Sequence, residues 1–345
     1  MIGFILFKPI KFCKSIINFN IIKKDFCLIL VFFLIANFFL FSILFYLNGI
    51  PLFNSGSRLE IYFGNNFSKI ITRLSKFFLD ILLILIPLCF FIDVNKYLKY
   101  VSVIFAAIVL LFMGSKASIL NIVNAFFVVS LFLANNGKFI YLDKIKKKSL
   151  KYIVIALSFA FLVISVTESH ANTFGFLIYR IIATADSYCM TFPNNTIDIF
   201  VSRDNWFINL FASPLRMLGL ITLEQVPPVL GTEISSYHSK QQMFTGPNPR
   251  HPVLGYIYFK YNFGLLFSFI LGIFCGFIRN KVVNYFSFST FGLIGFAFLY
   301  KICFSTETDF YFFLANIINF FGIYLLIYIA FLLLRKASIN LKIHS

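Results

Sequence analysis

The stretch "CLILVFFLIANFFLFSILFYLN", residues 27–48, contains no charged side chain and decides what kind of fold this chain adopts. An α-helix rises about 1.5 Å per residue, so this run forms a helix roughly 30 Å long, which matches the hydrocarbon thickness of a bilayer. A helix also satisfies its backbone N–H and C=O groups internally, as lipid requires. The stretch therefore predicts a membrane-spanning α-helix.

The rest of the chain repeats this composition. Of its 345 residues, 60% are hydrophobic and only 12% are charged, whereas about a quarter of the residues in a soluble domain are charged. Further apolar runs lie at 77–92, 97–113, 117–134, 152–167, 257–278, 284–301 and 310–334. We therefore expect an all-α polytopic integral membrane protein, a single membrane domain over residues 1–345 with about eight transmembrane helices and at most about eleven.

The basic residues are placed as in a membrane protein. The formal net charge is +17, and lysines gather in short segments between apolar runs, most densely in "KIKKKSLK" at 144–151. Cytoplasmic loops carry such an excess of lysine and arginine. This pattern predicts a cytoplasmic or interfacial N-terminus (1–26), a cytoplasmic tail (335–345) and a long periplasmic loop at 168–256. No basic and aromatic module stands apart from the apolar runs, which argues against a nucleic-acid partner.

The long loop at 168–256 concentrates the polar chemistry. Four of the eight arginines of the chain lie in it, together with a single lysine, Lys240. A guanidinium presents a planar fork of donors that matches phosphate or carboxylate oxygens, which suggests a ligand that carries such groups. Pairing with the acidic residues of the same loop is the alternative. Within the loop, residues 205–223 predict an amphipathic helix that lies on the outer leaflet or caps a cavity.

The segment "TGPNPRHP" (245–252) stands directly before the apolar run at 257–278. Pro249 and Pro252 restrict the backbone around Arg250 and His251, so these two donors lose little entropy when they hold a ligand. A rigid polar lip beside lipid suits a ligand with a polar head and an apolar tail. Histidine also serves as a base near neutral pH, although a loop histidine is commonly only a surface residue. No histidine pair has metal-ligand spacing and no nucleotide-binding motif occurs, so neither metal nor cofactor is expected.

Four motifs occur in a characteristic order: "GIPLFNSGSR" (49–58), "GSKAS" (114–118), "YRIIATADSY" (179–188) and "GPNPRHPVLGYIYFKYNFGLLFSFILGIFCG" (246–276). With them, the chain from about residue 30 onward resembles the bacterial O-antigen polymerases (Wzy), also called oligosaccharide repeat unit polymerases. Two departures stand out. Similar proteins often have Arg where this chain has Lys116, and they commonly have ten or more spans.

The resemblance implies a glycosyltransferase of the bacterial inner membrane that works at its periplasmic face. It would move a growing glycan from undecaprenyl diphosphate onto the next lipid-linked repeat unit, without a nucleotide sugar or a cofactor. Its partners would be undecaprenyl-diphosphate-linked oligosaccharides, membrane lipid and a chain-length regulator. The residues expected to hold the diphosphates are Arg180, Arg216 and Arg250, with Arg203 behind them. The candidate bases are His251 and Asp186, followed by His238 and Glu233.

Two other functions fit the same features. An O-antigen ligase shares the architecture and the donor and differs in its acceptor, which sequence discriminates poorly. A flippase or transporter of the lipid-linked sugar is expected to have an internal repeat and charged residues within its spans. The chain has no evident repeat, and Asp80 is the main charge inside its apolar runs. The polymerase is therefore the preferred hypothesis.

Overall fold

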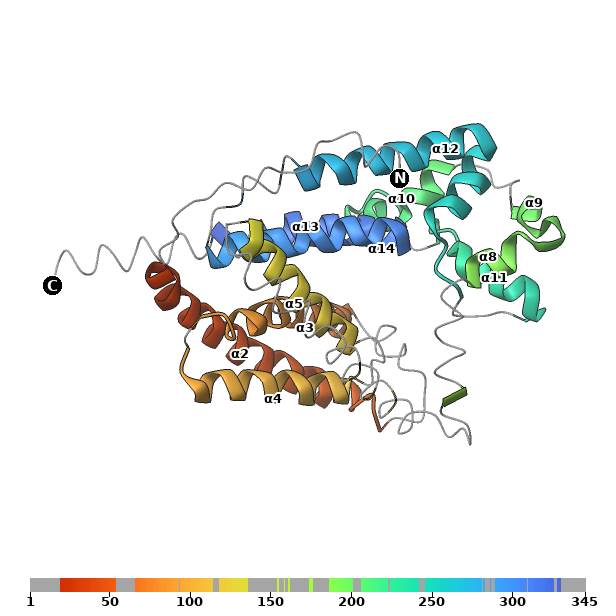
Figure 1. Cartoon of the computed structure of the whole chain (residues 1–345). Helices are drawn as coiled ribbons and strands as arrows, with labels where there is room; N and C mark the ends of the chain where they lie inside the picture. The colour runs from red at the N-terminus through yellow and green to blue at the C-terminus, as the bar shows by residue number, and fades with distance from the viewer. Residues whose placement is uncertain are drawn as a thin grey trace. The chain divides into compact units, whose positions relative to one another are not determined.

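A computed structural model gives the structure of the following part of the chain. The described residues are 19–53, 66–92, 94–113, 118–135, 154, 158, 161, 174–175, 186–200, 206–222, 224–241, 246–280, 282, 286, 289–308, 310–325 and 328–329. Every regular element within these ranges is a helix (Figure 1). The prediction of an all-helical fold is thus confirmed for this part of the chain.

The chain divides into two units. Unit 1 comprises Met1–Ile10, Arg180–Phe286 and Phe298–Ser345, and unit 2 comprises Lys11–Tyr179 and Ser287–Ala297. All of the candidate site residues fall within the residue ranges of unit 1.

Unit 2 is built around one long helix pair. Its helices are α2 (Phe19–Asn48), α3 (Asn66–Leu88), α4 (Lys96–Phe112) and α5 (Ser118–Asn135). α3 packs along α2 and also contacts α4 and α5. The fully buried Asn37 of α2 donates from Nδ2 to the carbonyl oxygens of Phe33 (2.7 Å) and Phe78 (3.1 Å). A buried amide is costly without such bonds, so Asn37 fixes how α2 lies against α3.

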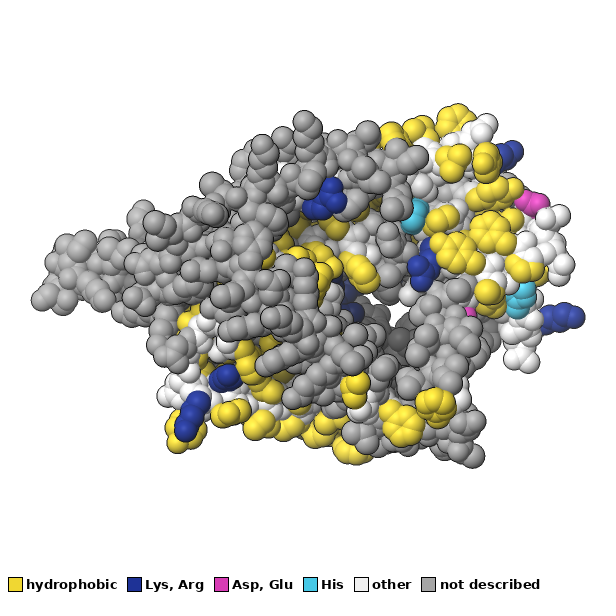
Figure 2. Space-filling model, viewed as in Figure 1, with side chains coloured by type: hydrophobic (Ala, Val, Ile, Leu, Met, Phe, Trp, Pro, Cys, Tyr) yellow, Lys and Arg dark blue, Asp and Glu magenta, His cyan; other side chains and the backbone are white. Residues whose placement is uncertain are grey.

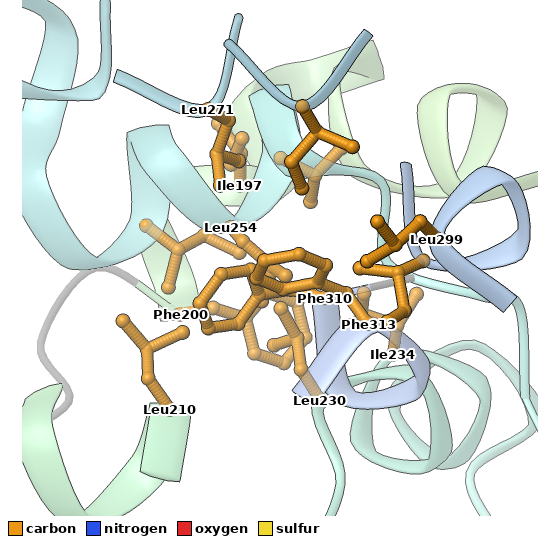
Figure 3. Packing of buried hydrophobic residues seen from close by; sticks show 14 residues of the cluster. Ile197, Phe200, Leu210, Leu230, Ile234, Leu254, Leu271, Leu299, Phe310 and Phe313 are labelled. Carbon is orange, nitrogen blue, oxygen red and sulfur yellow. The ribbon is translucent and has the colours of Figure 1, made fainter. Parts of the chain in front are cut away.

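The helices of unit 1 pack around a shared apolar core. They are α8 (Asp186–Thr191), η3 (Pro193–Asn195), α9 (Thr196–Phe200), α10 (Trp206–Met217), α11 (Leu230–Ser239), α12 (His251–Asn280), the end of α13 (Thr290–Thr308), α14 (Phe310–Asn319) and η5 (Phe320–Tyr324). Figure 3 shows Leu254, Phe200, Leu210 and Phe310 converging from different helices of this core. Burial of these large side chains therefore holds together the helices that carry the candidate site. Removing one such side chain from water contributes about 1.5–3 kcal/mol.

Helix α12 is interrupted at Lys260, which has φ 57° and ψ −170°. A Cβ built on Gly264 would lie only 2.8 Å from the carbonyl carbon and oxygen of Gly255. In an unbroken helix these two residues would be about 13 Å apart along the axis. The chain therefore bends back at Lys260, and α12 consists of a first arm (251–259) and a second arm (261–280). The sequence predicted one continuous apolar run at 257–278, so the position of this break is a correction.

Within the described ranges, two helices are long and apolar enough to cross a membrane. They are α12 and the Phe26–Asn48 part of α2. The second arm of α12 is by itself about 30 Å long, which is sufficient for the hydrocarbon layer. Shorter apolar helices occur at Asn121–Ala134, Thr290–Thr306 and Phe313–Gly322. The expected run at 152–167 lies almost entirely outside the described residues.

Several predicted boundaries change. The helix expected for the apolar run at 77–92 begins earlier, because α3 starts at Asn66. The segment between the apolar runs at 284–301 and 310–334 is mostly helical, because α13 continues to Thr308 before α14 starts at Phe310. The amphipathic helix expected at 205–223 is confirmed as α10 but ends at Met217. Gly219 stops it with φ 72°, and the N–H of Leu220 bonds to the carbonyl of Leu215 (2.9 Å), which is a Schellman cap.

The second arm of α12 meets α13 through two cysteines. Cys275 Sγ lies 3.9 Å from the carbonyl oxygen of Cys303 and 3.5 Å from Thr306 Oγ1. We expect a membrane-permeant oxidant to join Cys275 to Cys303, detected by mass spectrometry of the proteolysed protein. The exposed Cys189 should react but form no bond to Cys275. A Cys275–Cys189 product in place of Cys275–Cys303 would contradict this helix pairing.

Candidate functional site

The site is organised by the start of α12. Pro252 occupies the first turn of this helix, where its missing N–H forfeits no intrahelical bond. The carbonyl oxygen of Arg250 accepts from the N–H of Leu254 at 3.1 Å, so Arg250 directly precedes the helix and His251 is its first residue. The predicted rigid lip is therefore the N-terminus of α12. Cations at that position oppose the helix dipole, so another feature must hold Arg250 there.

An aromatic ring on α8 provides that support. The guanidinium carbon of the half-buried Arg250 lies 5.8 Å from the ring centroid of Tyr188. Tyr188 in turn stacks on Phe192, with ring centroids 6.0 Å apart. A cation over an aromatic face gains about 0.5–2 kcal/mol, more when water is excluded. Tyr188 thereby fixes the guanidinium against α8, the helix that begins with Asp186.

His251 and Asp186 belong to the same two elements. Both side chains are half-buried, and the Nδ1 atom of His251 is buried. α8 packs against the start of α12 and against α11. We call Asp186, Tyr188, Arg250 and His251 the α8–α12 cluster. Arg250 can supply N–H donors to an anion, and an imidazole or a carboxylate can accept a proton from a neighbouring hydroxyl.

Two further contacts tie this region together. The Tyr256 hydroxyl on the first arm of α12 donates to Asp198 Oδ1 of α9 at 3.5 Å. His238 of α11 places Nε2 2.6 Å from the carbonyl oxygen of Met190 in α8. Because a carbonyl oxygen only accepts, this Nε2 must carry the proton. His238, a reserve candidate for the base, therefore uses one ring nitrogen to hold α11 on α8.

Two glycines bring the polar segment onto α11. A Cβ built on Gly246 would lie 1.8 Å from the carbonyl oxygen of Gly231, and one built on Gly231 would lie 2.0 Å from that of Pro247. The two backbones therefore touch without room for any side chain. We call this the Gly231–Gly246 contact. Gly231 could not be predicted to take part, since a lone glycine at the start of a helical segment signals no distant partner.

Of the other predicted arginines, Arg216 lies within the described residues. Arg216 is exposed in the last turn of α10, a helix that packs against α14. A cation there also stabilises the negative end of the helix dipole, which is a sufficient structural reason for it. Arg180 and Arg203 lie outside the described residues. The structure thus brings Asp186, Arg250 and His251 onto adjoining elements, and it adds Tyr188, which the sequence did not single out.

The surface over these elements is mixed in character. Figure 2 shows histidine, basic and acidic side chains lying among hydrophobic ones where α8, α11 and the start of α12 are found. Within the described ranges, no group of three His, Cys, Asp or Glu residues is arranged to hold a metal ion. The α8–α12 cluster is therefore a site of a cation, an aromatic ring and two proton-accepting groups beside apolar surface.

The described part of the chain is an all-helical protein with two helices of membrane-spanning length and a polar cluster at the start of one of them. No family model, no curated protein and no solved structure matches this chain.

Proposed function

We propose that this protein polymerises undecaprenyl-diphosphate-linked oligosaccharide repeat units into O-antigen or a related surface polysaccharide. It acts as a multi-pass protein at the periplasmic face of the bacterial inner membrane. The observation that carries the proposal is the half-buried Arg250, whose guanidinium lies over Tyr188. Arg250 is followed by His251, and together they stand where the polar segment 245–252 leads into the apolar helix α12. The motif order that resembles the O-antigen polymerases supports the same function.

The proposed reaction is a glycosyl transfer with a lipid diphosphate as leaving group. A hydroxyl of the acceptor sugar attacks the anomeric carbon of the donor glycan, and the bond from that carbon to the diphosphate oxygen breaks. The hydroxyl proton passes to His251 or Asp186, and undecaprenyl diphosphate departs with the negative charge. Arg250 stabilises that charge through its fork of N–H donors. Most of the rate enhancement comes from holding the two lipid-linked substrates in place.

The two alternative functions use the same lipid-linked substrate. A ligase would transfer the finished glycan to a lipid A core, and a flippase would move the lipid-linked unit across the membrane without breaking a glycosidic bond. Neither requires that a single-unit glycan be extended. Loss of the gene therefore separates these functions by the length of the glycan that still reaches the surface.

We expect that deleting the gene leaves surface lipopolysaccharide that carries at most one repeat unit. Export and ligation of single units continue when polymerisation is absent, so the ladder of long chains disappears while the single-unit band stays. The measurement is electrophoresis of extracted lipopolysaccharide. Restoring the ladder with the intact gene on a plasmid is the control. Loss of the single-unit band as well would point to the ligase or the flippase.

We also expect the lysine-rich and arginine-containing segments to lie on opposite sides of the membrane. A reporter enzyme that is active only in the periplasm should work when fused after Asn194 in η3 and should be inactive when fused after Lys148. The asymmetric distribution of lysine is the physical reason. Reporter activity in the reverse order would remove the periplasmic site on which the proposed reaction depends.

A further inference from the structure

The bend of α12 presents aromatic side chains outward. Tyr261 and Phe263 are each 67% exposed, and the bend residue Lys260 is also exposed. Trp206 and Phe207, at the start of α10, are 46% and 47% exposed. We call these five residues the elbow surface.

Contacts between rings join the start of α10 to the bend of α12. The ring centroid of Trp206 lies 5.2 Å from that of Phe259, the residue before Lys260, and 5.8 Å from that of Phe207. Phe259 also packs against Phe267 on the second arm, with centroids 5.4 Å apart. The start of α10 is therefore attached to the bend of α12. Tyr261 and Phe263 follow this point of attachment directly in the sequence.

The position of this surface along α12 indicates its surroundings. No charged residue occurs between Lys260 and Arg279, and a helix of that length rises about 28 Å, close to the hydrocarbon thickness of a bilayer. The side of the second arm that follows the elbow surface exposes further apolar residues, among them Leu265, Leu266 and Ile270. The elbow surface is thus continuous with the flank of a helix of membrane-spanning length, whose two ends are marked by cations.

The composition of the elbow surface fits one particular layer of a membrane. Tryptophan and tyrosine concentrate at the boundary between hydrocarbon and head groups, because their rings are apolar at one end and hydrogen-bonding at the other. Lysine extends its ammonium from that depth to the lipid phosphates. We propose that the elbow surface inserts into the head-group layer of a phospholipid bilayer and so fixes the depth of α10 and of the bend in α12. This proposal does not depend on the proposed enzymatic function.

Trp206 allows a direct test, because it is the only tryptophan in the chain. The full-length protein is reconstituted into phosphatidylcholine vesicles whose acyl chains carry bromine either near the head groups or near the bilayer centre. We expect the fluorescence emission maximum of Trp206 to lie at a shorter wavelength than that of a tryptophan exposed to water. We expect bromine near the head groups to quench it more than bromine near the centre does, and aqueous iodide to quench it little.

A relocated tryptophan provides the matched control. Phe38 is an exposed residue near the middle of the Phe26–Asn48 span, so the double variant Trp206→Phe/Phe38→Trp should show the opposite order, with deep bromine the stronger quencher. Three results for Trp206 would overturn the proposal. The first is strong quenching by iodide and none by brominated lipid. The second is quenching by neither reagent, which means that protein covers the ring. The third is stronger quenching by bromine near the bilayer centre than by bromine near the head groups, as expected for Phe38→Trp. Enzymatic activity plays no part in the measurement, so a failed polymerase assay would leave it valid.

Discussion

Replacing Gly246 by alanine is expected to destabilise unit 1 by about 3 kcal/mol or more and to abolish long-chain polysaccharide. The added Cβ would lie 1.8 Å from the carbonyl oxygen of Gly231, and a backbone atom cannot yield as the end of a flexible side chain does. The segment 246–250 would have to leave α11, and Arg250 and His251 would move with it. Thermal unfolding of the purified protein in detergent measures the stability, and lipopolysaccharide electrophoresis measures the activity.

The glycines of the chain offer graded controls for this effect. A Cβ on Gly322 meets nothing within 4 Å, so Gly322→Ala should be nearly neutral. Gly219 has equally open space but a φ of +72°, so Gly219→Ala should cost only about 1 kcal/mol for the left-handed backbone. Gly231→Ala should resemble Gly246→Ala. The double variant should cost much less than the two single costs together, because one displacement relieves both clashes.

Two results of these stability measurements would contradict the Gly231–Gly246 contact. If Gly246→Ala is no less stable than Gly219→Ala, the two backbones do not touch. If Gly231→Ala and Gly246→Ala have fully additive costs, each glycine is needed for a separate reason. Either result would remove the physical explanation for how segment 246–250 is held on α11.

Some of this arrangement follows from local sequence. The uncharged run at 27–48 predicted the apolar helix α2, and Pro249 and Pro252 around Arg250 and His251 predicted a rigid entry to the next apolar helix. These features depend on neighbouring residues only. A hydrophobic run fixes a helix through its own length, and a proline acts on its own backbone and on the residue before it.

The remaining features depend on contacts between distant residues. Lysine rarely adopts a positive φ, and nothing in the continuous apolar pattern around Lys260 signals the bend that lets Gly255 meet Gly264. Tyr188 is an ordinary aromatic residue in its own segment and gains importance only because Arg250 lies over it. Arg216 illustrates the opposite case. Its residue type suggested a ligand, whereas its position at the end of α10 gives it a structural reason as well.

Arg250→Lys is expected to remove most polymerisation, although it keeps the positive charge. A lysine ammonium is a point charge, so it cannot supply two parallel donors to a diphosphate, and it does not stack on Tyr188 as a planar guanidinium does. His251→Ala should lower the rate by roughly two to four orders of magnitude if His251 is the base, and by much less if it only positions the substrate. The measurement is the chain-length distribution of surface polysaccharide at matched protein levels. Arg73→Lys is the control and should be silent, because Arg73 is an exposed residue of α3.

Variants of Tyr188 and Arg250 distinguish two roles for Arg250, which are binding of the substrate and packing against Tyr188. Tyr188→Phe keeps the ring under the guanidinium and should retain long chains, whereas Tyr188→Leu removes the ring and should reduce them, since Arg250 then loses its support. If Arg250 only packs, Arg250→Leu should restore apolar contact with Tyr188 and give a stable, active protein. If Arg250 holds a diphosphate, Arg250→Leu should be stable and inactive. Normal long chains from both Arg250→Lys and Arg250→Leu would show that the segment is only a stiff entry to α12. The diphosphate site would then have to be sought at Arg180 and Arg216.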